Sequence, residues 1–155
     1  MKASTQLIDA LNALLTDELT AIDQYAPHEG RAQTWGYGIF AAYVAERTED
    51  ERKHAKALIQ RIYELEGTPD TRTRNPVAYT TSLLDGLSHD RAAEVGAIAK
   101  YNSAIAIAVS LGDNATRDML VANLKDEDDH LLDIEKRLVQ AAQVTPAQWL
   151  STQIG

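Results

Sequence analysis

The sequence contains no cysteine, which excludes disulfides, cysteine-type zinc sites and iron–sulfur clusters. It also lacks any apolar run approaching the ~18 residues that a membrane span needs. Proline and glycine are few, and runs of β-branched residues are rare, so little in the chain interrupts helices. Basic residues are outnumbered 15 to 23 by acidic ones, which argues against nucleic acid as the main partner and is compatible with attracting cations.

The chain reads as helix throughout. The first helix is expected to begin at Ser4 or Thr5, both capable N-caps, and to run to the low thirties, with a bend or local defect at Pro27. Further helices are expected over residues 39–65, 82–111, from just after the turn at 112–114 to about 142, and over 146–152. We expect one all-α domain over residues 1–155.

The connector between the second and third helices decides the topology. Residues 67–81 carry two prolines and five threonines, and this segment of about 15 residues could span roughly 50 Å when extended. The second helix is roughly 40 Å long, so the connector can run back along it and set the third helix parallel to it. The short turns at 35–38 and 112–114 make antiparallel pairs. The pattern predicts a four-helix bundle with one long crossover and a short fifth helix.

One set of four residues occurs twice along the chain. Two of the four histidines follow a glutamate by three residues, and each pair has another glutamate 33 residues upstream (from 51 to 18 and from 127 to 94). Each upstream glutamate precedes a tyrosine by seven residues. The sets, shifted by 76 residues (from 18 to 94), are Glu18, Tyr25, Glu51 and His54, then Glu94, Tyr101, Glu127 and His130. The repeat predicts two similar hairpins related by approximate two-fold symmetry.

The repeated carboxylates interrupt apolar helical stripes that should face the core. A single glutamate–histidine pair on a helix is usually a solvated surface pair. A carboxylate buried without a partner costs several kcal/mol, however, so four of them in the core must be protonated, paired or metal-bound. Two divalent ions balance four glutamates, and two neutral imidazoles add no charge. Oxygen-rich ligands with one imidazole per metal suit iron or manganese better than a closed zinc site. The sequence therefore predicts two iron ions per chain, for which manganese or zinc could substitute.

Several stretches along the chain match the pattern of one known family: Leu11–Leu15, Glu18–Tyr25, Trp35–Tyr37, Asp50–Ala55, Leu65–Pro69, Glu94, Asp126–His130 and Gln148–Ile154. On these stretches, and over nearly its whole length, the sequence resembles the bacterioferritin family. The resemblance implies a ferritin-like fold that oxidises ferrous iron and stores the ferric product in a cytoplasmic, hollow 24-subunit cage built from two-fold dimers. It also implies the metal ligands: Glu18 and Glu94 terminal, Glu51 and Glu127 bridging, and His54 and His130 on one iron each.

Three positions depart from that family. Arg52 stands where the family has a methionine that binds haem at a two-fold interface, and a guanidinium stays protonated and cannot be an axial ligand. We therefore expect no haem. Glu46 replaces an inward-facing histidine that helps iron reach the cavity, while Asp50 is kept. Tyr101 stands where the family usually has an aliphatic residue, and a matched tyrosine pair is closer to rubrerythrins and symerythrin-like proteins.

A few other side chains carry narrower expectations. Tyr25 lies two turns from Glu18, as Tyr101 does from Glu94, so each hydroxyl could donate to a ligand carboxylate; we count Tyr25 as catalytic. Asp90 could orient a ligand histidine. His28 and His89 are expected at the surface or an interface, and the acidic run 126–129 is expected to be a solvated face apart from Glu127.

Two other functions remain open. One is a di-iron peroxidase without storage, of rubrerythrin or symerythrin type, with hydrogen peroxide rather than oxygen as the oxidant. The other is a haem-free subunit that assembles with a second, haem-binding bacterioferritin chain. The N-terminal residues Met1–Thr5 contain no apolar secretory segment, which favours the cytoplasm.

Overall fold

The computed structural model describes residues 4–155, so the part of the N-terminal interpretation that rests on Met1–Ala3 lies outside it. Its helices are α1 (Thr5–Thr34), α2 (Gly38–Glu64), α3 (Leu83–Ser110), α4 (Asn114–Gln143) and α5 (Pro146–Ser151). No strand occurs among the described residues. The expected helix bounds are confirmed to within about two residues, and α1 continues through Pro27 without interruption.

Side-chain caps explain where several helices begin. Ser4, Ser82, Asp113 and Thr145 each precede a helix, and each accepts a hydrogen bond from the backbone N–H three residues on. Such a cap satisfies one of the backbone donors that the first turn leaves without a partner. The α3–α4 turn needs Gly112, whose φ of 69° lies in the left-handed region that glycine adopts without strain.

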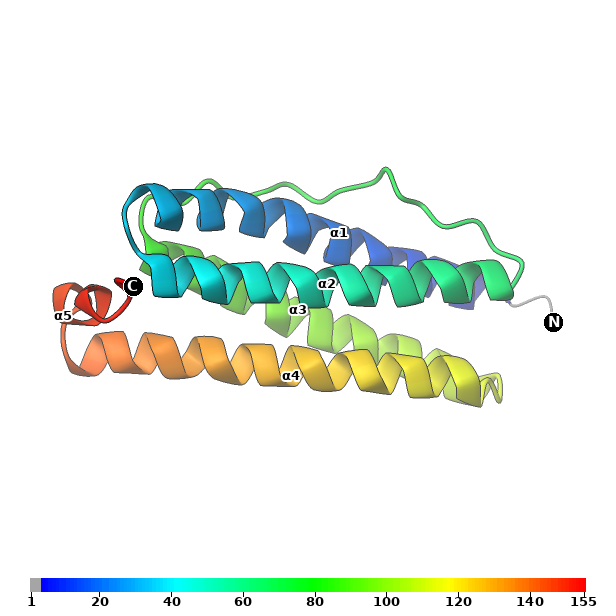
Figure 1. Ribbon diagram of the computed structural model, residues 1–155. Helices are drawn as coiled ribbons and strands as arrows, with labels where there is room; N and C mark the ends of the chain where they lie inside the picture. The colour runs from blue at the N-terminus through cyan, green and yellow to red at the C-terminus, as the bar shows by residue number, and fades with distance from the viewer. Residues whose placement is uncertain (1–3) are drawn as a thin grey trace.

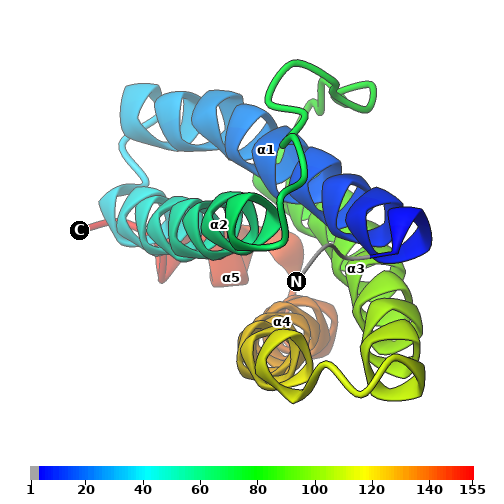
Figure 2. The ribbon, with the colours of Figure 1, turned by 90° about the vertical axis from the view of Figure 1, so that its right-hand side faces the viewer.

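The long helices form a four-helix bundle with one long crossover (Figure 1), and this confirms the predicted topology. The connector after α2 runs back along the outer side of α1, so α3 lies parallel to α2 while the two hairpins are antiparallel. The end-on view shows the connector on the outer side of α1 (Figure 2). It is fastened to α1 by Gln24, which both donates to and accepts from the backbone of Ala78 at 2.7 Å.

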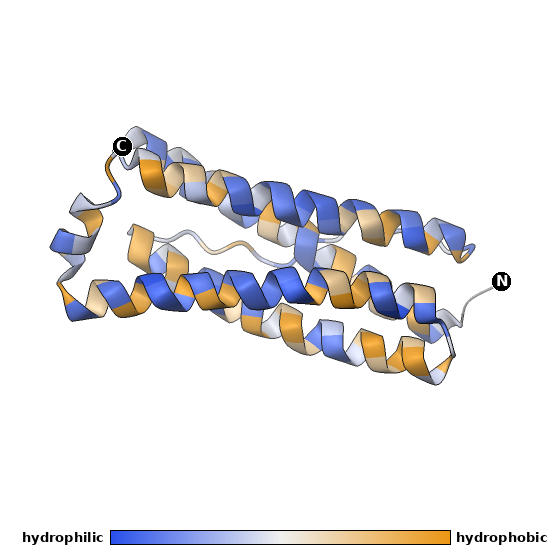
Figure 3. Cartoon of the chain, turned by 60° about the horizontal axis from the view of Figure 1, so that its bottom comes forward, coloured by the Kyte–Doolittle hydropathy of each residue, from blue (hydrophilic) through white to orange (hydrophobic). Residues whose placement is uncertain are grey.

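The apolar core is divided into two clusters. The first includes Leu11, Leu58 and Leu120, and the second includes Phe40, Leu87 and the α5 side chain Trp149. Figure 3 shows how hydrophobic and hydrophilic residues alternate around the helices, with apolar stripes broken by polar stretches along their length. On each long helix the repeated glutamate falls between residues of the two clusters, so a buried polar layer crosses the middle of the bundle.

The sequence predicted no membrane-spanning segment. Along residues 4–155 no helix is both long enough and apolar enough to cross a membrane.

Candidate metal centre

The buried polar layer brings together the six predicted ligands from four helices. Two groups each contain ligand atoms within 4.8 Å of one another. They are Glu18, Glu51, His54 and Glu127, and Glu51, Glu94, Glu127 and His130. Glu51 and Glu127 belong to both groups, while Glu18 and Glu94 belong to one each, which is compatible with the bridging and terminal roles that the family resemblance implied. All six side chains are buried.

Both histidines point the same ring nitrogen at the carboxylates. His54 Nδ1 lies 2.8 Å from a Glu127 oxygen and 3.2 Å from a Glu51 oxygen. His130 Nδ1 lies 3.4 Å from oxygens of the same two glutamates. The two rings are stacked with centroids 6.2 Å apart and planes 26° apart. A metal ion between these groups would therefore be bound through Nδ1 on both sides.

The opposite nitrogens contact two aspartates that the sequence interpretation assigned elsewhere. His54 Nε2 lies 3.1 Å from Asp126, and His130 Nε2 lies 3.5 Å from Asp50. A carboxylate on the outer nitrogen fixes the tautomer and orientation of a ligand imidazole. We expected Asp126 to lie on a solvated face, and its side chain is 57% exposed. It also contacts the outer nitrogen of His54, which that expectation did not include. The sequence did contain an indication of these contacts, because each aspartate directly precedes a glutamate that both groups share.

Asp90 does not orient a ligand histidine, so that expectation was wrong. It pairs with His28 at 3.3 Å, and both side chains are buried. His28 is therefore not a surface residue, and Gly86 makes room for it, since a Cβ there would lie 3.3 Å from the imidazole ring. His89 is exposed at the surface, as expected.

The two buried tyrosines donate to the glutamates of the opposite hairpin. Tyr25 on α1 donates to Glu94 on α3 at 3.0 Å, and Tyr101 on α3 donates to Glu18 on α1. Each acceptor is thus one of the two glutamates expected as terminal ligands, but it lies on the opposite helix and not on the tyrosine's own helix, as sequence spacing suggests. Asn123 adds a second contact to one side only, donating its amide N–H to the Tyr101 oxygen at 3.2 Å. Burial, followed by the neighbouring glutamate charge, raises the pKa of both phenols, so they remain donors.

The cluster without metal holds protons that a metal ion would displace. Burial and the charge of Glu127 raise the pKa of Glu94 to about 8. Burial also raises the pKa of Glu18. For His130, burial lowers the pKa, but the nearby carboxylates of Glu127, Glu51 and Glu94 outweigh it and raise the pKa to about 12. Metal ligands must lose such protons, so metal binding here releases them.

Two buried atoms support the fit to metal. Glu127 Oε1 and His130 Nδ1 are buried and, among residues 4–155, make no well-aligned hydrogen bond, although they lie 2.8 Å from His54 Nδ1 and 3.4 Å from a Glu127 oxygen, respectively. Buried polar atoms ordinarily have hydrogen-bond partners. An ion at the centre of each group would satisfy both atoms and balance the carboxylate charge.

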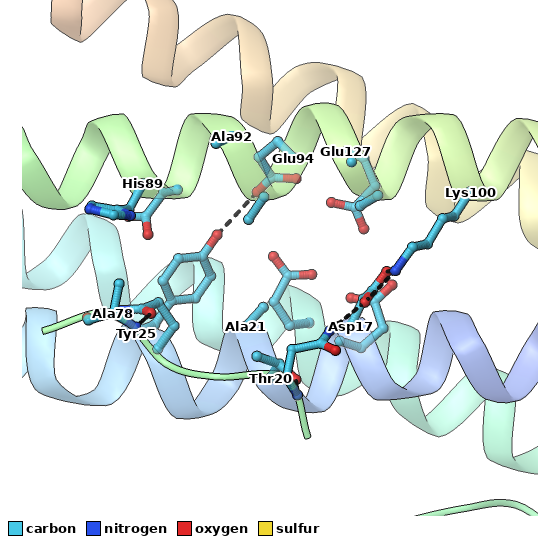
Figure 4. Close-up of a pocket in the computed structure, with 18 of the residues that line it drawn as sticks. Asp17, Thr20, Ala21, Tyr25, Ala78, His89, Ala92, Glu94, Lys100 and Glu127 are labelled. Carbon is cyan, nitrogen blue, oxygen red and sulfur yellow. Dashed lines mark hydrogen bonds and ion pairs between the residues drawn. The ribbon is translucent and has the colours of Figure 1, made fainter. Parts of the chain in front are cut away.

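A cavity of about 300 Å³ lies between α1, α3 and the connector and reaches the carboxylates (Figure 4). Small residues of α3 leave this space: Ala92, Ala93, Gly96 and Ala97 line it. Figure 4 shows Tyr25 reaching across the cavity to Glu94, and Lys100 paired with Asp17 on another side. The cavity thus adjoins Glu18 and Glu94 on this side of the bundle.

Two of the three residues that depart from the bacterioferritin pattern, Arg52 and Glu46, lie on α2 and have exposed side chains outside the carboxylate–histidine cluster. The side chain of Arg52 is 57% exposed and pairs with Glu49 in the preceding turn. The side chain of Glu46 is 70% exposed and lies 3.7 Å from Arg47.

Comparison with known proteins agrees with this arrangement. The family described as ferritin-like domain matches residues 8–144. The chain is 35% identical to a bacterial ferritin of Pseudomonas aeruginosa, covering 99% of this chain and 100% of that one. It is 32% identical to a bacterial ferritin of Synechocystis sp., covering 99% of both chains. It is also 32% identical to a bacterioferritin of Brucella melitensis, covering 93% of this chain and 89% of that one.

Proposed function

The chain belongs to the bacterioferritin family, and on that premise we propose that it is an iron-storage ferroxidase. Ferrous ions are its substrates, each giving up one electron. Two of them supply the electrons that reduce hydrogen peroxide to two water molecules with uptake of two protons, or oxygen to peroxide. The observation that carries the proposal is the pair of overlapping carboxylate–histidine groups that share Glu51 and Glu127.

The residues divide the work of holding the two ions. Glu51 and Glu127, which both groups share, would contribute to both positions, Glu18 and His54 would complete one, and Glu94 and His130 would complete the other. Asp126 and Asp50 orient the two imidazoles from behind. The phenols of Tyr25 and Tyr101 hold the terminal carboxylates in place. The cavity between α1 and α3 gives the oxidant a route to this pair.

We further propose that the subunits build a closed cage from two-fold dimers, as the family's ferric mineral requires an enclosed space. The relatives match along nearly their full length, including the C-terminal segment. Arg52 in place of a methionine implies that a cage made of this chain alone carries no haem. We place the protein in the cytoplasm.

The test of the oxidation site is the substitution Glu127→Ala, assayed by stopped-flow oxidation of added ferrous iron. Because Glu127 contributes to both positions, its loss should abolish the fast phase rather than slow it. Glu135→Ala is the control, since Glu135 also lies on α4 but forms an exposed ion pair with Arg91. Oxidation by the Glu127→Ala protein at the parent rate would show that the site is wrongly assigned.

A second candidate function is a di-iron peroxidase without storage. The observation that favours it is the donor bond from Tyr101 to Glu18, which makes the two halves of the centre more alike. Native mass separates the two functions, because a cage supports storage and an isolated dimer supports the peroxidase. A second chain that co-purifies and carries haem would instead indicate a subunit of a mixed cage.

A further inference from the structure

The approximate symmetry of the centre is broken in the contacts that surround the ligands. On the side of Glu18 and His54, Tyr101 donates to Glu18, and Asn123 donates to the same phenol oxygen. On the side of Glu94 and His130, Tyr25 donates to Glu94, and the structure shows no equivalent amide on its oxygen among the described residues. Asn123 is therefore one side chain that makes the two halves different.

The amide restricts what the Tyr101 hydroxyl can do. A phenol has one proton to donate and accepts through its oxygen. With the amide N–H of Asn123 on that oxygen, the remaining direction for the proton is toward Glu18. A carboxylate that holds a metal has lost its own proton, so it can only accept this bond. The Tyr101 hydroxyl, which Asn123 orients, therefore holds Glu18 in one orientation.

The imidazoles show the same difference. Asp126 makes a hydrogen bond of 3.1 Å to His54 Nε2. Asp50 lies 3.5 Å from His130 Nε2, and it also accepts from Lys53 at 2.8 Å and lies 3.4 Å from Arg47. Two cations compete for the Asp50 charge, so it supports its histidine less strongly than Asp126 does.

We infer that Tyr101 and Asn123 make the position formed by Glu18 and His54 the tighter of the two metal positions, so that the first metal ion binds there. This inference rests on the proposed two-metal site. Asn123 is a positioning residue that acts through the Tyr101 hydroxyl. The position formed by Glu94 and His130 binds second and releases its ion more readily.

The experiment is titration of the metal-free, full-length protein with Co²⁺, followed by calorimetry and visible absorption. The parent should bind two ions per chain in two resolved steps. Tyr101→Phe should weaken the tighter step by about tenfold or more, which is typical for loss of a group that supports a ligand. The matched variant Tyr25→Phe should weaken the looser step instead. Glu94→Gln and Glu18→Gln assign the steps, since each leaves one position with its full set of ligands.

A double-mutant cycle separates positioning from packing. Asn123→Leu keeps the branched, four-heavy-atom shape of the side chain and removes the donor, so it should weaken the tighter step while leaving the looser one unchanged. In the Tyr101→Phe background the same change should have no further effect, because the oxygen it acts on is gone.

Two equal binding steps, or a Tyr101→Phe protein weakened in the looser step, would overturn the inference while leaving the two-metal site intact. Additive effects of the two substitutions would overturn the role given to Asn123. A protein that binds no Co²⁺ would refute the proposed site itself, and this inference with it.

Discussion

Replacing Glu94 with glutamine should stabilise the metal-free protein in a way that depends on pH. Glutamine keeps an oxygen that can accept from Tyr25, but it does not ionise. In the folded chain, burial and the charge of Glu127 raise the pKa of Glu94 to about 8, against an ordinary value of 4.5. The folded state therefore holds a proton that the unfolded state gives up. The contribution to stability is complete below the unfolded pKa and is lost as the pH rises toward the folded one.

The size of the effect follows from the two pKa values. Each pH unit between them corresponds to about 1.4 kcal/mol. Between about pH 5 and about pH 7, the parent should lose roughly 2–3 kcal/mol of unfolding free energy that the Glu94→Gln protein keeps. The two proteins should therefore be similar in acid, and the variant should be more stable near neutrality.

The assay is urea unfolding of chelator-treated protein, followed by circular dichroism at several pH values and one fixed chain concentration, since assembly also affects stability. Glu135→Gln is the control and should parallel the parent, because Glu135 forms an exposed ion pair. Saturating Co²⁺ should reverse the order, since the parent keeps both metal positions complete. Parallel pH profiles for Glu94→Gln and the parent would refute the reasoning.

Three further predictions concern assembly and the oxidant. The purified homomer should show no Soret band, because Arg52 cannot ligate haem. A Soret band at one haem per two chains would contradict this, and the variant Arg52→Met tests whether haem binding returns. In sedimentation the protein should run as a closed cage, and deletion of residues 145–155 should reduce it to smaller species, whereas a monodisperse dimer of the full chain would exclude the cage. Stopped-flow oxidation of the ferrous protein should be faster with hydrogen peroxide than with oxygen, because Tyr101 adds a second donor that holds the carboxylates. The variant Tyr101→Leu should remove that preference. An unchanged preference would show that Tyr101 is only a core aromatic residue.

The features that sequence could predict are those fixed along a single helix. Helical periodicity places Glu51 and His54 on one face regardless of the partner helix, and caps such as Ser4 act within one turn. The connector length fixed the direction of α3 because only a long segment can return along the bundle. These constraints were sufficient to predict the fold and to gather six candidate ligands in one layer.

The features that sequence did not predict depend on how helices face one another. Spacing along α1 pairs Tyr25 with Glu18, but packing of α1 against α3 brings it to Glu94 instead. The sequence suggested that His28 lies at the surface, but Gly86 on α3 leaves room for its ring in the interior. The asymmetry introduced by Asn123 has no counterpart in the repeated motif, because it arises from a contact between α3 and α4.

The connector between α2 and α3 has a consequence for how such a protein can diversify. Its residues Asn75, Pro76 and Ala78 border the cavity that reaches the carboxylates, yet the segment contributes none of the six candidate ligands. It is held to α1 chiefly through side chains such as Gln24 and through Thr20, which accepts from the Asn75 backbone. Changes in this segment can therefore alter which molecules reach the centre while the helices that build it stay the same. The connector residues that border the cavity and the helix residues that form the metal cluster can therefore vary independently.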